Sequence, residues 1–256
     1  MRKAKLVRKI QRSAIRFLKY FFRKLGISDR DQFMIRKLGL TYFKTTISLM
    51  SKSRSQLRQD FFVIFELKGN KKRGGYFVEF GATNGIDLSN TYLLETEFSW
   101  TGILAEPARF WEKQLKANRP NASIETLCVW KDSNSSLMFN ETDSPELSTI
   151  DSFSDGDGHR NTRLSGKKYK VQTISLNDLL VKHRAPKYID YLSIDTEGSE
   201  FEILEAFNFN EFSFGIITVE HNYTPQREKI FALLTSHGYK RKYENISAFD
   251  DWYVKS

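Results

Sequence analysis

The stretch YFVEFGATNGIDLSNTYLLE, residues 76–95, decides the fold. Its first five residues are mostly apolar and aromatic, which is typical of a buried strand. Gly81 and Gly85 then supply positions where the backbone can turn tightly and where a ligand can approach it. A helical pattern follows at about residues 89–98. We therefore predict the first strand, turn and helix of an open sheet, in which ligands bind beyond the carboxyl ends of the strands.

Strands and helices alternate along the rest of the chain. Strands are predicted at residues 76–81, 102–105, 123–129, 188–195 and 215–220. Helices are predicted near residues 89–98, 108–118, 176–183, 200–207 and 226–236. Such alternation predicts an α/β fold with a mostly parallel sheet and helices on both faces. The last two strands, near 239–243 and 248–254, are joined by a short turn, so we expect them to be antiparallel.

The composition is that of a globular, cytoplasmic protein. Of 256 residues, 40% are hydrophobic and 14% aromatic, which excludes a disordered chain. Cys128 is the single cysteine, so an intrachain disulfide and a cysteine-based zinc cluster are excluded. Lys19 and Arg23 interrupt the apolar cluster at residues 17–22, and no apolar run approaches the ~20 residues of a membrane span.

The basic residues are concentrated at the front of the chain. Residues 1–59 hold 17 of the 40 lysines and arginines but only two of the 31 acids, Asp29 and Asp31. The remaining residues are therefore net acidic. We divide the chain into a basic helical extension at residues 1–53 and an α/β domain at residues 54–256.

Residues 1–27 have the pattern of a basic amphipathic helix. They contain ten lysines and arginines and no acid, and apolar residues recur at a spacing of three to four. Such a helix suits the surface of an anionic membrane, to which each basic side chain contributes about 1 kcal/mol. Two alternatives remain: docking of the apolar stripe on the protein's own domain or on a second subunit, and contact with nucleic acid.

The segment at residues 131–168 is polar and has little periodicity. We predict a functional or mobile loop there, because long segments of this kind within a compact domain usually are one or the other. Its DGDGH sequence, residues 155–159, lacks the ligand spacing and the distant glutamate of an EF-hand and is better explained as a turn.

Two acids indicate the kind of ligand. Glu79 lies within the first predicted strand, where it would repel a pyrophosphate and attract a cation, and the phosphate-binding glycine motifs are absent. Glu106 closes the next strand, a position suited to hydrogen bonds from ribose hydroxyls. An amine and a sulfonium combined with a ribose indicate S-adenosylmethionine. The alternative is that Glu79 is a surface acid and that Glu106 is a helix N-terminal charge before Pro107.

Five long strings, in order along the chain, resemble the FkbM-type methyltransferases. They are GGYFVEFGATNGIDLSNTYLLE (74–95), GILAEPAR (102–109), IDYLSIDTEGSEFEIL (189–204), ITVEHN (217–222) and DDWYV (250–254). SQLRQDFFVI at residues 55–64 is similar to the lead-in segment of that family. The resemblance covers about residues 55–254. It implies a Rossmann-like class I methyltransferase fold with seven strands, S-adenosylmethionine as the donor, and O-methylation as the commonest reaction.

The same resemblance implies a set of donor-binding residues at the first turn and at the ends of the next strands. They are Glu79, Gly81, Ala82, Thr83, Asn84, Gly85, Ser89, Asn90, Glu106, Pro107, Val129, Trp130 and Asp132. The first six line the methionine end, and Ser89 and Asn90 begin a helix whose N–H groups can receive the carboxylate. Val129, Trp130 and Asp132 flank the adenine. Ser89 is equally well explained as a helix N-cap.

Acids and a histidine at two strand ends are the catalytic candidates. Asp195 and Glu197 precede Glu200 within six residues, and such crowding is costly unless a cation or a hydroxyl proton lies between the acids. His221 closes the fifth strand with a pKa suited to a general base, and Asp195 or Glu197 could orient it or act in its place. Glu200 has the alternative role of a helix cap, and His221 that of a structural histidine. A divalent metal is compatible with these residues but not required by them.

The sequence therefore predicts an O-methyltransferase that acts on a hydroxyl, in our interpretation that of a sugar in a glycan or glycolipid at the cytosolic membrane face. The oligomeric state stays open. The first alternative is a membrane-surface binding protein without turnover. The second is a nucleic-acid methyltransferase, which the acidic character of residues 60–256 disfavours.

Overall fold

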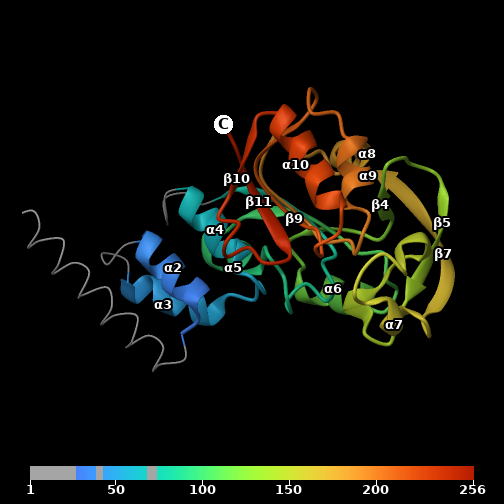
Figure 1. The fold of residues 1–256 in the computed structure, drawn as a ribbon, viewed down its shortest axis with the longest axis horizontal. Helices are drawn as coiled ribbons and strands as arrows, with labels where there is room; N and C mark the ends of the chain where they lie inside the picture. The colour runs from blue at the N-terminus through green and yellow to red at the C-terminus, as the bar shows by residue number, and fades with distance from the viewer. Residues whose placement is uncertain (1–26, 39–42, 68–73) are drawn as a thin grey trace, which may run out of the picture. The chain divides into compact units, whose positions relative to one another are not determined.

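A computed structural model describes residues 27–38, 43–67 and 74–256 of the chain. It divides into two compact units, residues 1–52 and 53–256, which we describe separately (Figure 1). The basic amphipathic helix predicted at residues 1–27 lies outside the described residues except for Ile27. The roles assigned to the basic extension and to the α/β domain therefore stay predictions.

Two helices make up the described part of the first unit. They are α2 (Asp29–Leu38) and α3 (Phe43–Lys52), which contact each other. The hydroxyl of Ser28 caps α2 by accepting a hydrogen bond from the backbone N–H of Asp31, at 3.0 Å. The acids of α2 lie in its first turn and its basic residues in its last turn, as the helix dipole favours.

The second unit is built on a seven-stranded sheet of order β10-β11-β9-β8-β1-β2-β3. The strands are β1 (Tyr76–Phe80), β2 (Thr101–Ala105), β3 (Ser123–Glu125), β8 (Tyr188–Ile194), β9 (Ser213–Glu220), β10 (Tyr239–Lys242) and β11 (Asp250–Lys255). From β3 to β9 all neighbours are parallel, whereas β11 runs antiparallel to both β9 and β10. The predicted Rossmann-like class I sheet with an antiparallel C-terminal hairpin is confirmed.

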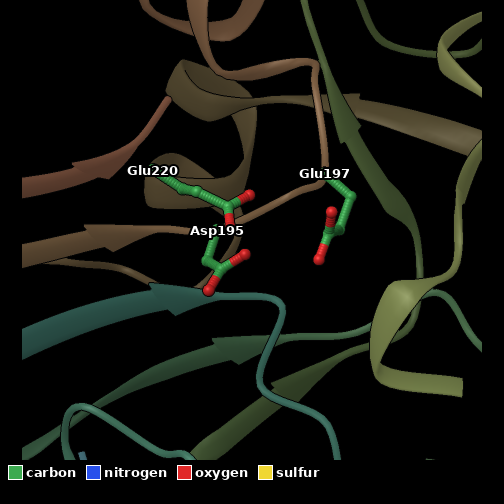
Figure 2. A group of neighbouring side chains, drawn as sticks. All are labelled: Asp195, Glu197 and Glu220. Carbon is green, nitrogen blue, oxygen red and sulfur yellow. The ribbon is translucent and has the colours of Figure 1, made fainter. Parts of the chain in front are cut away.

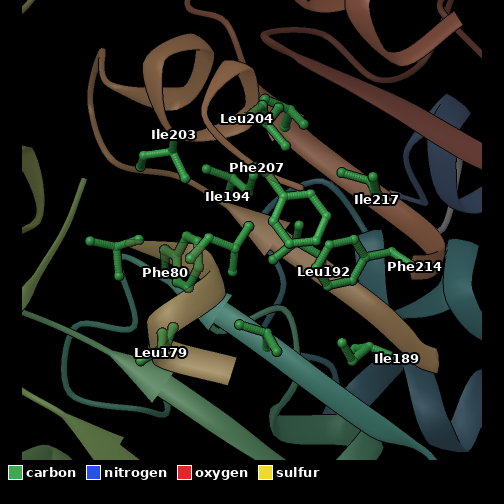
Figure 3. Packing of buried hydrophobic residues seen from close by; sticks show 14 of the residues in the cluster. Phe80, Leu179, Ile189, Leu192, Ile194, Ile203, Leu204, Phe207, Phe214 and Ile217 are labelled. Atoms are coloured by element: carbon green, nitrogen blue, oxygen red, sulfur yellow. The ribbon is translucent and has the colours of Figure 1, made fainter. Parts of the chain in front are cut away.

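Helices cover both faces of this sheet. In Figure 1, α8 (Leu176–Lys182), α9 (Glu200–Glu205) and α10 (Gln226–Ser236) lie on one side, and α4 (Gln59–Glu66) and α5 (Tyr92–Phe98) on the other, with α6 (Glu112–Asn118) following β2. Figure 3 shows the core on the side of α8 and α9, where Leu192 and Ile217 of the sheet pack with Leu204 and Phe207. Each such buried side chain stabilises the fold by roughly 1.5–3 kcal/mol.

Two helices begin later than predicted, α5 at Tyr92 instead of Ser89 and α6 at Glu112 instead of Ala108. The reason is the same in both. The backbone N–H of Asn90 donates to Glu79, and that of Ala108 donates to Glu106. The strand-end acids thus hold the intervening residues in turns before each helix begins.

The prediction of a loop at residues 131–168 is wrong in part, because strands form within this segment. This part of the chain contributes to a second, four-stranded sheet of order β4-β7-β5-β6, at one end of the unit (Figure 1). Its strands are β4 (Cys128–Trp130), β5 (Ser136–Glu141), β6 (Thr149–Ile150) and β7 (Lys167–Ser175). The short 3₁₀ helices η2 (Pro145–Leu147) and η3 (Asp151–Phe153) and the helix α7 (Arg160–Arg163) lie between them.

The predicted strand at residues 123–129 is divided between the two sheets. The carboxylate of Glu125 accepts hydrogen bonds from the backbone N–H groups of Thr126 and Leu127, which turns the chain out of the large sheet. After this turn β4 pairs with β7 of the small sheet. None of the helices in the described parts of the chain has the length and apolar character needed to cross a bilayer.

Candidate active site

A cavity of about 560 Å³ lies at the carboxyl ends of the central strands. Residues that follow β1, β2 and β8 line it, namely Gly81, Glu106 and Asp195, together with Glu220 at the end of β9. Another part of its lining comes from residues 145–159, which lie between β5 and α7 and contain η2, β6 and η3. The cavity therefore has a strand-end side and a side formed by this segment, which we call the wall.

The lining of the cavity is strongly acidic. Six carboxylic acids line it, and no lysine or arginine does so among the residues that the structure describes. They are Glu79, Glu106, Glu146, Asp195, Glu197 and Glu220. Such a lining favours a cation over a phosphate, because a cation stabilises the ionised form of these carboxyls, whereas a phosphate would meet like charge.

The turn after β1 touches the end of β8. Gly81 has a φ of +70°, and a Cβ placed on it would lie 1.9 Å from the carbonyl oxygen of Asp195. A side chain cannot be accommodated at this position without moving the backbone. Gly85 also has a positive φ, but a Cβ there would meet the side chains of Leu115 and Arg119 at 2.7 and 2.6 Å. Gly85 is therefore needed for packing away from the cavity.

Glu79 is buried and hydrogen-bonded within the turn. Its exposed fraction is 3%, and it accepts hydrogen bonds from the backbone N–H of Asn90 at 2.6 Å and from the hydroxyls of Ser89 and Thr91. Burial raises the pKa of its carboxyl, and the charge of Arg119 opposes that rise. Glu79 lines the cavity, but three of its roughly four acceptor positions are already used by the protein.

Glu106 presents a carboxylate to the cavity from the end of β2. Its two oxygens accept hydrogen bonds from the backbone N–H groups of Thr83 and Ala108, both at 2.9 Å. It is 6% exposed, and burial raises its pKa to about 7 although both N–H donors oppose the rise. Each oxygen keeps a further lone pair, so the group can still accept hydrogen bonds from a ligand.

Three acids converge at the ends of β8 and β9. Figure 2 shows Asp195 and Glu220 facing each other and Glu197 reaching toward the same space from the loop after β8. Oxygens of the three carboxyls lie within 4.8 Å of one another. Asp195 is partly exposed, whereas Glu197 and Glu220 are each 6% exposed. These oxygens are of the kind that hold hard divalent cations, so the cluster could also accommodate one.

Asp195 and Glu220 share a hydrogen bond. Burial, with the charge of Glu200 adding to it, raises the pKa of Asp195 to about 7. Burial and the neighbouring acids raise the pKa of Glu220 well above its ordinary value. The pair therefore holds a proton near neutral pH and titrates as a unit.

Glu197 is held from two directions. Its Oε2 accepts hydrogen bonds from Nη2 of Arg163 at 2.7 Å and from the side-chain amide of Asn222 at 3.4 Å. Burial and the charge of Asp195 raise its pKa, and the guanidinium of Arg163 lowers it. Glu200, in contrast, accepts hydrogen bonds from the backbone N–H groups of Thr196 and Gly198, so it caps that turn.

The ring of His221 does not line the cavity with Asp195 and Glu197. It is 4% exposed, its Nδ1 accepts a hydrogen bond from the backbone N–H of Tyr223 at 3.0 Å, and its Nε2 lies 3.8 Å from Asp251. Burial lowers its pKa. We therefore revise the hypothesis that His221 is the base, since the ring faces Asp251.

The structure brings together part of the predicted donor set. Besides the residues described above, Thr83, Asn90, Pro107 and Val129 line the cavity. Six predicted donor residues do not: Ala82, Asn84, Gly85, Ser89, Trp130 and Asp132. Asn84 accepts hydrogen bonds from the N–H groups of Ile86 and Asp87 within its own turn. Trp130 packs against Phe153 of η3 because β4 belongs to the small sheet.

Several lining residues were not predicted. They include Gln56, Leu88, Cys128, Phe139, Leu147, Ile150, His159, Glu220, Asn222, Tyr223 and Phe249. Glu220 and Asn222 lie on either side of His221 in the ITVEHN string, so the sequence contained a signal for them. For the wall residues the sequence carried no such signal.

Comparison with known proteins identifies the family. A family model described as the methyltransferase FkbM domain matches residues 79–241. The chain belongs to the FkbM methyltransferase family. No curated protein matches it.

Solved structures similar to this FkbM family member include two methyltransferases. One is the FkbM methyltransferase from Methylobacillus flagellatus, with 10% identity over 88% of this chain and a TM-score of 0.46. This chain covers 58% of the length of that protein. The other is the precorrin-6y C5,15-methyltransferase from Geobacter metallireducens, with 10% identity, 76% and 85% of the two chains covered, and a TM-score of 0.41.

Proposed function

We propose that this FkbM family member transfers a methyl group from S-adenosylmethionine to a hydroxyl group of its acceptor. The observation that carries the proposal is Glu106, whose buried carboxylate faces an acidic cavity immediately after β2. A ribose hydroxyl pair fits the acceptor positions that Glu106 keeps free, and a positively charged donor fits the acidic lining.

The donor-binding roles rest on the predicted residues that line the cavity. Gly81, Thr83 and Asn90 surround the methionine part, Glu106 accepts from the ribose, and Val129 contacts the adenine. Cys128 joins Val129 there, in place of Trp130 and Asp132. When bound, S-adenosylmethionine supplies a methyl group already activated by its sulfonium. The protein's remaining tasks are alignment of the acceptor and removal of its proton.

Asp195 is the residue that we propose as the base. Its carboxyl is open to the cavity and has a pKa of about 7, so a useful fraction is ionised at neutral pH. As the acceptor oxygen takes the methyl group, its proton passes to Asp195. Glu220 stabilises the ionised form of Asp195 through their hydrogen bond. Glu197, already held by Arg163, remains the second candidate, and no step requires a metal.

The acceptor that we propose is a sugar hydroxyl of a glycan or glycolipid. An uncharged polyhydroxyl molecule suits a cavity with six acids and no lysine or arginine in its described lining. The same lining argues against a nucleic acid, because phosphate contacts would meet like charge. Binding to an anionic membrane through residues 1–27 is part of the proposal, supported by their ten basic residues. Deletion of residues 1–27 should abolish sedimentation with anionic liposomes, and unchanged sedimentation would remove this part.

The test uses the purified chain, methyl-labelled S-adenosylmethionine and a glycan and glycolipid fraction from cells that lack the protein. We expect label in that fraction, none in a nucleic-acid fraction, and none with Asp195→Asn. Saturable donor binding is measured in parallel by calorimetry. A wild-type chain that binds no donor would contradict the donor assignment, and label confined to nucleic acid would contradict the acceptor class.

A further inference from the structure

One buried guanidinium joins three segments of the chain. Arg163, at the end of α7, has a side chain with 0% exposure. Its Nε donates to the carbonyl of Leu147 at 2.9 Å, its Nη1 to Asp157 at 2.8 Å and its Nη2 to Glu197 at 2.7 Å. A planar group with donors on three sides can hold three acceptors at once, which a lysine cannot do.

All three of these segments border the cavity. Leu147 and Glu197 line it, and Asp157 directly precedes Gly158 and His159, which line it as well. Arg163 itself is not among the lining residues. It therefore acts on the cavity only through the residues that it holds.

The wall is tied to the strand-end side close to this point. The hydroxyl of Thr149 in β6 donates to the carbonyl of Glu197 at 2.8 Å, which makes this tie. The amide of Asn140 donates to the carbonyl of Arg163 at 2.9 Å and so joins β5 to α7. Neither of these contacts neutralises a charge. The pairs of Arg163 with Asp157 and Glu197 are buried, and removal of one partner from such a pair leaves a charge without compensation.

We propose that Arg163 is a positioning residue for methyl transfer, which fastens the wall at residues 145–159 to Glu197 and so fixes the acceptor side of the cavity beside Asp195. The role of Arg163 in methyl transfer rests on the proposed function. Its role in holding residues 145–159 against Glu197 does not.

The first experiment measures hydrogen exchange in residues 145–159 of the full chain. Loss of charge-assisted hydrogen bonds should speed exchange there about tenfold or more in Arg163→Gln. The matched control is Arg160→Gln, which removes an exposed arginine from the same helix and should leave the exchange unchanged. If Arg163→Gln does not fold, Arg163→Lys is compared with Arg160→Gln instead. This variant keeps the positive charge but lacks the planar guanidinium that binds three acceptors. Unchanged exchange in residues 145–159 would overturn the proposal.

The second experiment separates positioning from general destabilisation. In the labelled-methyl assay, kcat should fall about tenfold to a hundredfold in Arg163→Gln, while the KM and calorimetric Kd for S-adenosylmethionine stay within about twofold. If Arg163 acts through Glu197, adding Glu197→Gln to Arg163→Gln should cause little further loss. Two results would overturn the proposal. One is an equal loss of donor affinity and of kcat in Arg163→Gln, and the other is a double variant whose loss of kcat equals the sum of the two single effects. A wild-type chain without donor binding would instead refute the proposed function, and the exchange result would still decide the fastening.

Discussion

The two sides of the cavity are built differently. On the strand-end side, backbone N–H groups of the turns donate to buried acids, as from Asn90 to Glu79 and from Thr83 to Glu106. The wall is held chiefly by the side chain of Arg163, through its ion pairs with Asp157 and Glu197. The first side is thus fixed by contacts to the backbone, whereas the second relies on the side chain of one arginine.

This difference has a functional consequence. A site fixed by contacts to the backbone, including the close approach of Gly81 to Asp195, suits a ligand that does not vary, such as the methyl donor. The wall consists mainly of short 3₁₀ helices and loops, with β6 as its strand, and lies outside the seven-stranded sheet. It can change without disturbing that large sheet, which suits selection of the acceptor. We therefore expect the same substitution to have different effects on the two sides.

The largest expected effect is on Asp195. Asp195→Asn should lower methyl transfer by about 10²–10⁴-fold because the amide cannot take the proton, while donor affinity stays unchanged. Single-turnover assays with labelled donor measure this. The matched control is Glu146→Gln, the same kind of change at an exposed acid of the wall, which should have a small effect. Equal losses in both variants would contradict the assignment of the base.

The next largest effect is the difference in stability between a glycine substitution on the strand-end side and one on the wall. Gly81→Ala places a Cβ 1.9 Å from the carbonyl oxygen of Asp195, and we expect a loss of about 2–4 kcal/mol in the free energy of unfolding. Gly158→Ala, on the wall, has nothing within 4 Å of its Cβ and should change stability by less than about 0.5 kcal/mol. Denaturant titration of both variants decides this, and similar stabilities would show that the first turn is not constrained as described.

Donor affinity tests Glu106. Glu106→Gln removes the charge but keeps an acceptor oxygen, and affinity for S-adenosylmethionine should fall about tenfold to a hundredfold. Glu125→Gln is the control, because Glu125 also ends a strand but does not line the cavity. Calorimetry that shows the same donor affinity for Glu106→Gln and wild type would remove Glu106 from the donor site.

The pH dependence of kcat should report Asp195. A base must be deprotonated to act, and the pKa of Asp195 is raised to about 7, so kcat at saturating donor should rise with pH up to about 7 and then level off. Below the midpoint the change is about tenfold per pH unit. Glu106→Gln should keep this profile, since saturating donor removes the effect of affinity. A flat profile from pH 5 to 8 would exclude Asp195 as the base.

The smallest expected effect is on His221. Its ring does not line the cavity, so His221→Phe should lower transfer by less than about tenfold, through the lost hydrogen bond to Tyr223. The labelled-methyl assay measures this. A loss as large as that of Asp195→Asn would restore His221 as the base.

The sequence predicted the sheet and much of the strand-end side because a short stretch of sequence indicates each strand and the polar residue that follows it. Gly81, Glu106 and Asp195 each follow an apolar strand directly, so their edge of the sheet could be inferred. Successive side chains of a strand alternate between faces, and the sequence did not show that Glu220 lines the cavity whereas the ring of His221 does not.

The wall could not be predicted from the sequence. The strand β5 has a mixed burial pattern, with Phe139 and Asn140 buried but Ser136 and Met138 exposed, so it lacks the alternation of a half-buried strand. Its pairing with β7 comes from long-range contacts. Nothing in the local sequence of Arg163 indicated a buried arginine held by Asp157 and Glu197.

A crystal structure of the chain with bound S-adenosylhomocysteine would test the central claim most directly. We predict the nucleoside in the cavity at the strand ends, with its ribose hydroxyls about 2.6–3.2 Å from the carboxylate of Glu106. A nucleoside bound elsewhere, or one whose ribose points away from Glu106, would contradict the account.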